Sequence, residues 1–368
     1  MTLPFTISDQ RTRFDSARAV MEQAVRDRAF PGAAYGVLLD GDVVALDAVG
    51  RFTYDDASPE VMPETVFDLA SVTKVMATTS AAMLLFDRGV LDLEMPVGEI
   101  LPRFVIGRRP GSSKERVTVR MLLAHSSGLP AYARLFEQHT SANALLRACL
   151  QMPLDAAPET RAEYSDIGFI LLGKALEVLA GDSLARFCRR EIFAPLELTR
   201  AYFCPPAAMR SLIPPTENDT AFRGRVIQGE VHDEHAFVLG GCGGHAGLFA
   251  SALDVLRFAA CIVAKGRTAT GQQLFQTDTV QLFATRQSAP PGTSRALGWD
   301  TPTAPSSSGK HFSASSIGHL GYTGTSLWID PERKLAVVLL TNRTWPDRSS
   351  KAIQQIRPAF HDAIYIGL

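Results

Sequence analysis

Hydrophobic residues near the start of the chain follow first a helical and then an extended spacing. In residues 14–28 the apolar positions recur every three or four residues, which predicts a helix with one buried face. Residues 33–39 and 43–49 are two short apolar runs joined by Asp40-Gly41-Asp42, a combination typical of a hairpin turn. The chain is therefore predicted to open with a helix followed by a β-hairpin.

The middle of the chain has mostly helical spacing, and strands return near the end. The predicted helices span residues 69–88, 117–124, 142–150, 165–179, 183–192 and 253–264. Residues 288–316 are rich in Ser, Pro and Gly and predict a long surface excursion. Two apolar runs, 325–329 and 334–340, then flank the turn at 330–333 and predict strands, and residues 350–366 predict a closing helix.

This order of elements predicts an α+β fold. One antiparallel sheet would be built from both ends of the chain and flanked by helices. Residues 1–75 and 246–368 would form the sheet lobe, and residues 76–245 an inserted, mostly helical lobe. We expect the active site at the interface between the two lobes.

Composition and charge narrow the possible partners. Lys and Arg number 37 against 38 Asp and Glu, so the net charge of −1 argues against a nucleic acid or an anionic membrane surface as partner. Residues 1–10 contain no basic segment followed by an apolar run, so no secretory signal is predicted. The five cysteines are widely spaced and include no Cys-x-x-Cys, which argues against a disulfide framework and favours a cytoplasmic protein. The sequence leaves the oligomeric state open.

The first candidate for chemistry is Ser71-Val72-Thr73-Lys74 at the start of a predicted helix. Residues three apart share a helix face, so the Lys74 amine would lie beside the Ser71 hydroxyl. A serine becomes a nucleophile when a base takes its proton, and a lysine with a lowered pKa can be that base. The apolar residues around the pair do not resemble a solvated helix surface. The position is also a strand-to-helix transition, where a nucleophile can be presented at the rim of a sheet.

Two further motifs follow in order, and together they carry a resemblance to a known superfamily. The three motifs are Ser71-x-x-Lys74, Tyr164-Ser165-Asp166 and His319-Leu320-Gly321, and segments 122–130, 243–249 and 298–299 support them. In these motifs the chain resembles the serine β-lactamase and penicillin-binding protein superfamily over residues 14–366. It looks closest to the class C-like branch, which includes family VIII carboxylesterases and D-amino-acid peptidases. In this family the third motif is expected to begin a strand near the C-terminus.

The resemblance implies a role for each matching residue. Ser71 would be the nucleophile, and Lys74 and Tyr164 the proton-transfer pair. The backbone N–H groups of Ser71 and Tyr322 would form the oxyanion hole. The remaining matches, which we expect to contact the substrate, are Asp166, His319, Gly321 and His245. No cofactor and no metal are predicted.

Two positions depart from the usual family pattern. Asp166 stands where Asn is commoner, and a carboxylate beside Lys74 would raise the pKa of the lysine and make it a poorer base. We therefore expect Lys74 to act as a cation that lowers the pKa of Tyr164, with tyrosinate taking the Ser71 proton. His319 replaces the lysine usual in β-lactamases, and a neutral imidazole holds a carboxylate less strongly.

Three functions remain open on these residues. The favoured one is a carboxylic-ester hydrolase working through a Ser71 acyl-enzyme. The alternative is a β-lactamase or D-alanyl-D-alanine-type peptidase, and a non-catalytic sensor or scaffold is the third. In each case the partner would be a small ester, a β-lactam or a peptide.

Two other patterns are given a structural interpretation. Gly181-Asp182-Ser183-Leu184 spells a lipase signature, but Gly181 can end one helix and Asp182 or Ser183 can cap the next. The segment 232–235, His-Asp-Glu-His, with His245 downstream, could ligate a metal. Without a His-Glu-x-x-His pattern we interpret it as a polar loop lining the cleft.

Overall fold

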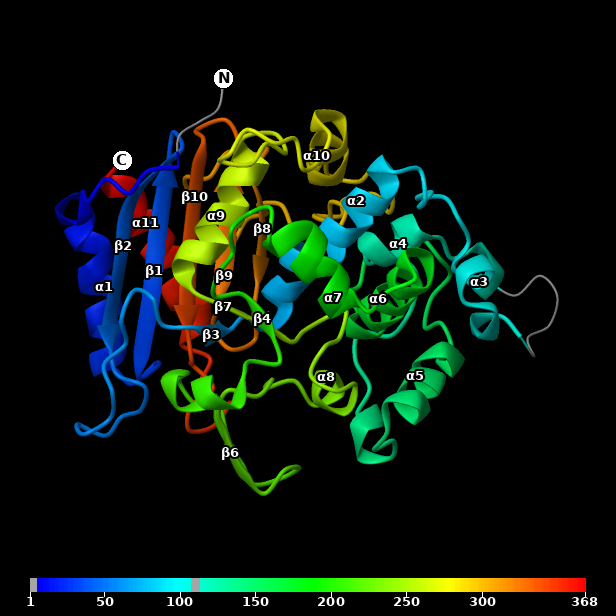
Figure 1. Ribbon diagram of the computed structural model, residues 1–368, viewed down its shortest axis with the longest axis horizontal. Helices are drawn as coiled ribbons and strands as arrows, with labels where there is room; N and C mark the ends of the chain where they lie inside the picture. Colours follow the sequence, from blue (N-terminus) through cyan, green and yellow to red (C-terminus); the bar gives the residue numbers. More distant parts are fainter. Residues whose placement is uncertain (1–4, 107–112) are drawn as a thin grey trace.

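A five-stranded antiparallel sheet lies at one end of the protein (Figure 1). The computed structural model describes residues 5–106 and 113–368. The strands lie in the order β2 (Asp42–Gly50), β1 (Gly32–Leu39), β10 (Leu335–Thr341), β9 (Ser326–Asp330) and β8 (Ile317–Leu320). The prediction of one antiparallel sheet built from both ends of the chain is thus confirmed.

Successive side chains of the central strands point alternately into two separate hydrophobic cores. Ala34 and Leu38 of β1 face the same core as Val338 of β10, whereas Tyr35 and Val37 face the opposite one. This period of two is what a strand buried on both faces requires. β1 pairs with β10 so that Gly36 lies opposite Val338, which joins positions about 300 residues apart in the sequence.

Helices cover both faces of the sheet. α1 (Asp15–Arg26) and α11 (Ile353–Ile366) pack on one face, and α9 (Ala252–Val263) packs on the other, as Figure 1 shows. The Tyr35 and Phe360 rings meet edge to face with centroids 5.3 Å apart, which joins β1 to α11.

The remaining helices lie beside the sheet and surround the largest apolar core. They are α2 (Ser80–Asp87), α3 (Val97–Ile100), α4 (Val119–Leu123), α5 (Ala142–Gln151), α6 (Asp166–Ala180), α7 (Leu184–Cys188), α8 (Glu234–Val238) and α10 (Thr277–Ala284). The sequence analysis did not predict α3, α8 or α10, and the interpretation of 232–235 as a loop was wrong for Glu234 and His235, which form the start of α8 because Asp233 caps it. Instead of one helix over 69–88, the chain forms a 3-10 turn at Ala70–Val72, a π-helical stretch at Lys74–Thr79, and then α2.

Two predictions about the last third of the chain need correction. Residues 288–316 contain no helix or strand, but they do not all lie on the surface. Trp299 is buried and stacks on Phe258 with centroids 6.2 Å apart, because the apolar segment 296–299 is drawn into the core. The motif His319-Leu320-Gly321 does not begin a strand: His319 and Leu320 end β8, and Gly321 starts the turn to β9.

Two small sheets complete the fold. One consists of β3 (Phe67–Asp68), β7 (Leu248–Ala250) and β4 (Tyr202–Phe203), and the other of β5 (Glu217–Asp219) and β6 (Arg225–Ile227). β7 is tied to the segment after β3 by two hydrogen bonds, Leu69 N–H to Leu248 O and Leu248 N–H to Thr73 Oγ1. This pairing fixes where residues 69–74 enter the helical region. Among the described residues, no helix is both long enough and apolar enough to cross a bilayer.

Candidate active site

Ser71 lies on a tight 3-10 turn between β3 and the π-helical stretch. Ala70, directly before it, has a φ of +46°, a conformation that costs a non-glycine residue about 1 kcal/mol or more. The buried carboxylate of Asp68 holds this turn by accepting from the Ala70 N–H at 2.8 Å, and its second oxygen accepts from the His232 N–H at 2.7 Å. Asp68 thus anchors the residue before Ser71, a role that the sequence analysis missed.

The Lys74 ammonium is fully buried, and all three of its N–H donors are used. They reach Ser71 Oγ at 2.9 Å, Asp166 Oδ1 at 2.7 Å and the His245 carbonyl at 3.0 Å. Burial by itself lowers the pKa of Lys74, but the interactions with Asp166 and Tyr164 outweigh burial, so the pKa lies above its ordinary value. This environment favours the charged form of Lys74.

Tyr164 lies against Lys74 in the cavity wall. The Lys74 Nζ is 4.8 Å from the centre of its ring, and the rings of His125 and His319 lie 4.6 and 5.9 Å away. Burial raises the pKa of Tyr164 to about 12, while Lys74 pulls it down and Asp166 pushes it up. The positive charge of Lys74 is therefore what favours loss of the Tyr164 hydroxyl proton.

α6 supplies the second motif through its N-terminus. Ser165 caps the helix by accepting from the Gly168 N–H, and its hydroxyl donates to the Pro130 carbonyl at 2.6 Å. His125 Nδ1 accepts from the Ser165 N–H at 3.0 Å, as expected for a buried structural histidine. These contacts place Asp166, the first residue of α6, against Lys74.

His319 at the end of β8 is held as a neutral imidazole. Burial, with a contribution from Lys74, lowers its pKa to about 3. Its Nδ1–H donates to the Leu320 carbonyl at 2.9 Å, and Nε2 has no partner among the described residues. His319 therefore offers an acceptor nitrogen, and not a cation, beside Tyr164.

The turn between β8 and β9 is fastened to the segment before Ser71. The Thr323 and Thr325 hydroxyls donate to the carbonyls of Asp68 and Leu69 at 2.7 and 2.8 Å. Gly321 allows this contact, because a Cβ there would lie 2.4 Å from the Leu69 oxygen. The Tyr322 N–H donates to no other described residue, so it is available for an oxyanion.

A cavity of about 710 Å³ opens onto this group. Of the sequence-predicted residues it is lined by Ser71, Tyr164, Asp166, His319, Gly321 and Tyr322. Lys74 lies behind the wall. The His245 side chain is buried and is not among the lining residues, and its carbonyl contacts Lys74. The structure thus brings together all the predicted residues, with His245 behind the wall instead of facing the cavity.

Cationic residues complete the cavity, and the sequence analysis missed them. Arg343 and Arg357 line it, and both donate to backbone carbonyls: Arg343 Nε to Tyr322 O at 2.6 Å, and Arg357 Nη2 to Gly321 O at 2.6 Å. No ion pair of either is found among the described residues, whereas Arg348, which also lines the cavity, pairs with Glu217 and Glu234. Each acts across more than twenty residues of sequence, so no local motif could have indicated it.

The lipase-like tetrapeptide has the structural role expected of it. Gly181 ends α6 with a φ of +64°, and Ser183 caps α7 by accepting from the Arg186 N–H. Neither residue lines the cavity. Ser183 is therefore a helix cap.

Comparison with known proteins identifies the family. A model of the beta-lactamase family matches residues 17–359, nearly the whole chain. The chain belongs to the beta-lactamase family. Its members are serine hydrolases, and the protein is accordingly a serine hydrolase with the β-lactamase/transpeptidase-like fold, as the motifs predicted.

Similar proteins carry names that refer to different hydrolytic activities. The chain is 32% identical over 376 residues to the N-acetylmuramyl-L-alanine amidase of Bacillus subtilis (strain 168), covering 92% of this chain and 84% of the relative. It is 30% identical to the "putative D-alanyl-D-alanine carboxypeptidase" of Escherichia coli (strain K12), covering 86% and 79%. The solved structure of EstCE1, a hydrolase with promiscuous acyltransferase activity, has a TM-score of 0.75 at 23% identity, covering 96% and 99%. That last likeness concerns the fold alone.

Proposed function

We propose that the protein hydrolyses a carboxylate-bearing amide or ester through an acyl-enzyme formed on Ser71. The observation that carries this proposal is the contact of Lys74 Nζ with Ser71 Oγ at the edge of the 710 Å³ cavity. Ser71 Oγ attacks the substrate carbonyl while Tyr164, beside the Lys74 cation, takes the hydroxyl proton. The C–N or C–O bond of the substrate then breaks, and the proton passes from Tyr164 to the departing amine or alcohol. Water then hydrolyses the acyl-enzyme and regenerates the serine.

In this proposal the oxyanion is stabilised by the N–H groups of Ser71 and Tyr322. The two are held together because Thr323 and Thr325 bind the backbone just before Ser71. Donors fixed before the reaction lower the barrier without a reorganisation cost, and one such donor is worth about 2.7–4 kcal/mol.

Lys74 serves mainly as a cation in the proposed proton transfer. Its charge is favoured by Asp166, and that charge stabilises a tyrosinate at Tyr164. His319 Nε2, unpartnered and neutral, supplies a further acceptor beside the phenol.

Arg343 and Arg357 in the cavity wall favour a substrate that carries a carboxylate. Arg343 and Arg357 donate only to carbonyls within the described structure, so their charges are not neutralised by a direct carboxylate contact. A substrate carboxylate can supply that counter-ion. Because two relatives are named for cell-wall peptide substrates, we place a D-alanyl peptide or an N-acetylmuramyl-L-alanine amide first and a simple carboxylic ester second.

A substrate panel with matched variants tests the proposal. We would measure turnover of a D-Ala-D-Ala peptide, an N-acetylmuramyl-L-alanine amide, a p-nitrophenyl short-chain ester and a chromogenic cephalosporin. Ser71→Ala should lower kcat by about 10⁴-fold or more on every substrate that the wild type turns over. It should also abolish labelling by a fluorophosphonate or a penicillin.

Ser183→Ala is the matched control. It removes the serine of the lipase-like tetrapeptide and should leave kcat unchanged while costing about 1 kcal/mol of stability through the lost cap. Turnover that survives Ser71→Ala would remove Ser71 from the nucleophile's role. A wild type that takes up no acylating label would favour the sensor or scaffold function.

A further inference from the structure

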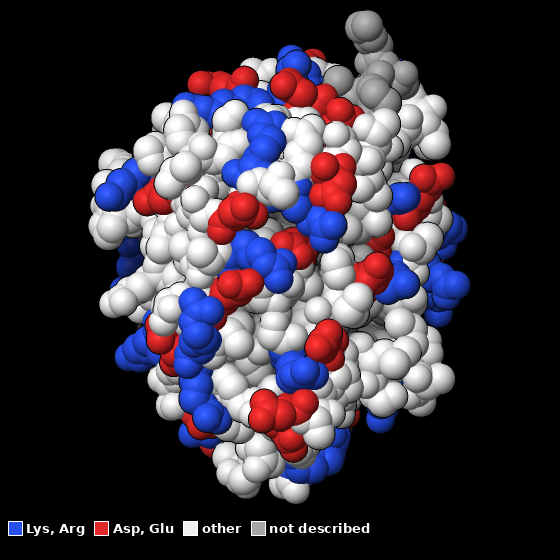
Figure 2. Space-filling view, turned by 90° about the vertical axis from the view of Figure 1, so that its left-hand side faces the viewer, with Lys and Arg blue, Asp and Glu red and all other residues white. Residues whose placement is uncertain are grey.

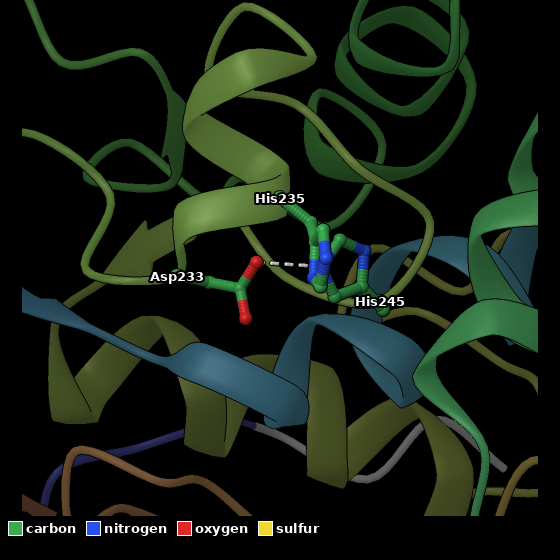
Figure 3. A group of neighbouring side chains, drawn as sticks. All are labelled: Asp233, His235 and His245. Atoms are coloured by element: carbon green, nitrogen blue, oxygen red, sulfur yellow. Dashed lines mark hydrogen bonds and ion pairs between the residues drawn. The ribbon is translucent and has the colours of Figure 1, made fainter. Parts of the chain in front are cut away.

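Three side chains that the reaction does not use form a second cluster beside the cavity. Asp233 precedes α8, His235 lies within it, and His245 comes from the loop before β7. One possible ligand atom of each lies within 4.8 Å of the other two. Figure 3 shows the Asp233 carboxylate directed at the two neighbouring imidazoles.

The imidazoles of this cluster lack the partners that buried polar groups normally have. Neither nitrogen of His235, which has 0% exposure, meets a hydrogen-bond partner among the described residues, nor does His245 Nδ1. The rings of Tyr132 and Phe136 pack edge-on against His235 at 5.1 and 5.4 Å and offer it no acceptor. An unpartnered buried imidazole is destabilising, so the position needs an explanation.

A hydrogen bond between Asp233 and His245 does not supply that explanation. His245 Nε2 lies 2.7 Å from Asp233 Oδ1, yet this contact leaves His235 without any partner. Neighbouring His232 shows the contrast, because its Nε2 is satisfied by Glu217 at 3.0 Å. The unpartnered nitrogens are thus not common to this loop.

The kinds of group in the cluster suit a cation as the missing partner. Imidazole nitrogens and carboxylate oxygens are common ligands of transition-metal ions, and both nitrogens of His235 and Nδ1 of His245 have no other partner among the described residues.

We propose that Asp233, His235 and His245 bind one divalent transition-metal ion of the Zn²⁺ type. Two imidazoles and one carboxylate suit such an ion, whereas Mg²⁺ and Ca²⁺ prefer oxygen ligands only. Gly243 makes room for the site, because a Cβ there would lie 2.7 Å from the His245 ring. The proposal does not depend on the reaction proposed for Ser71.

The position of the site indicates which ligand the ion would take. Asp233 lines the same cavity as Ser71, and the His245 carbonyl accepts from Lys74. Three protein ligands leave a coordination position open in a tetrahedral site. On the cavity side that position is accessible to water or to a substrate oxygen.

Metal content after loading tests the site. The purified protein would be stripped with a chelator, loaded with Zn²⁺, freed of excess metal and analysed by elemental mass spectrometry. The wild type should retain about one equivalent per chain. His235→Phe should lose it, because Phe fits between Tyr132 and Phe136 but provides no ligand. Co²⁺ loading of the wild type should give the visible absorption of a tetrahedral site, again absent in His235→Phe.

His361→Phe is the matched control. His361 is also buried, has neither nitrogen partnered and packs against two phenylalanine rings, but it lies on α11 outside the cluster. His361→Phe should keep the full equivalent, and Zn²⁺ should raise its Tm and that of the wild type by a few degrees when present at about 100 times Kd. Mg²⁺ should raise neither.

A second variant guards against misfolding as the cause of metal loss. Asp233→Asn keeps the side-chain oxygen that accepts from the Ala236 N–H at the start of α8, and it should still lose most of the zinc. The proposal is overturned if wild type and His235→Phe retain equal amounts of zinc, or if the Co²⁺ spectrum is the same in both. Fluorophosphonate labelling, read on the same samples, reports on Ser71 separately.

Discussion

Asp166 sets the charge state of the proposed proton-transfer group. A carboxylate can only accept, and here it accepts from Lys74 at 2.7 Å, whereas an asparagine could also donate to a substrate amide. It raises the pKa of Lys74 and also that of Tyr164. The acid limb of the rate profile should therefore report on this one side chain.

Asp166→Asn should move the acid limb of kcat/KM to lower pH. The active form is the deprotonated base, and removing the negative charge lowers the pKa of Lys74 and of Tyr164, so activity persists to lower pH whichever of the two is the base. The measurement is a pH–rate profile of both proteins. Asp182→Asn, which removes an ion-paired carboxylate from the segment before α7, should leave the acid limb at the same pH. If the acid limb of kcat/KM in Asp166→Asn lies at the same pH as in the wild type, the proposed role of the Asp166 charge is contradicted.

The residues of the site that stand in the motifs could be predicted from the sequence, but the residues that position them could not. Ser71, Lys74, Tyr164, Asp166 and His319 stand in short ordered motifs, and the structure brings them together. Arg343 and Arg357 act through backbone atoms of distant segments, and Asp68 joins the Ala70 N–H to the distant His232 N–H, which no local spacing reveals. The cluster of Asp233, His235 and His245 was considered and set aside, because the sequence could not show which of the histidines lack other partners.

At the scale of elements, the site depends on how the turn after β8 rests on the turn before Ser71. The sequence predicted one regular helix over 69–88, but the chain changes from a 3-10 turn to a π-helical stretch before α2 begins. Periodicity could not predict such a change, because residues 72–85 are all buried and no one-sided apolar pattern distinguishes the helix types. The irregular backbone is concentrated where Ser71 and Lys74 must meet.

Gly321→Ala should separate the two halves of the proposed oxyanion hole. The new Cβ would lie 2.4 Å from the Leu69 oxygen and closer still to Thr325, so the turn must move. We expect kcat to fall by about 10²-fold or more, because one oxyanion donor is displaced. Steady-state kinetics with the best substrate of the panel would measure this.

Gly168→Ala is a fair comparison for that variant. Gly168 lies near Asp166 on α6, and its added Cβ would meet nothing closer than 3.5 Å. Alanine is also the better helix former, so stability should hold or rise slightly. Equal losses of kcat in the two variants would argue against the displaced donor.

For the whole molecule, the layer of α1 and α11 on the sheet stabilises the fold, and α11 also supplies Arg357 to the cavity. The face that includes α1, shown in Figure 2, carries both signs of charge interspersed, in keeping with the net charge of −1. Beneath it, His361 of α11 is buried against Phe312 and Phe360. Burial, with a smaller effect of Arg357, lowers its pKa to about 3.

This buried histidine should make the fold sensitive to acid. The unfolded chain binds a proton at His361 below about pH 6.5 and the native one does not until about pH 3, so stability is complete above 6.5 and falls as the pH drops toward 3. His361→Phe should reduce that loss by about 1.4 kcal/mol per pH unit within this window. Urea unfolding at several pH values would measure it. The same slope in both proteins would show that His361 is protonated in the native state.

The pairing of β1 with β10 has a consequence during synthesis. β1 and β2 leave the ribosome early, but β10 follows only after about 300 further residues. Until then the hairpin has an unpaired edge and no α11 against its apolar face, which is an opportunity for aggregation. A nascent chain of this protein should therefore rely on chaperone protection until β10 and α11 have emerged, even though its three catalytic motifs precede β10 in the sequence.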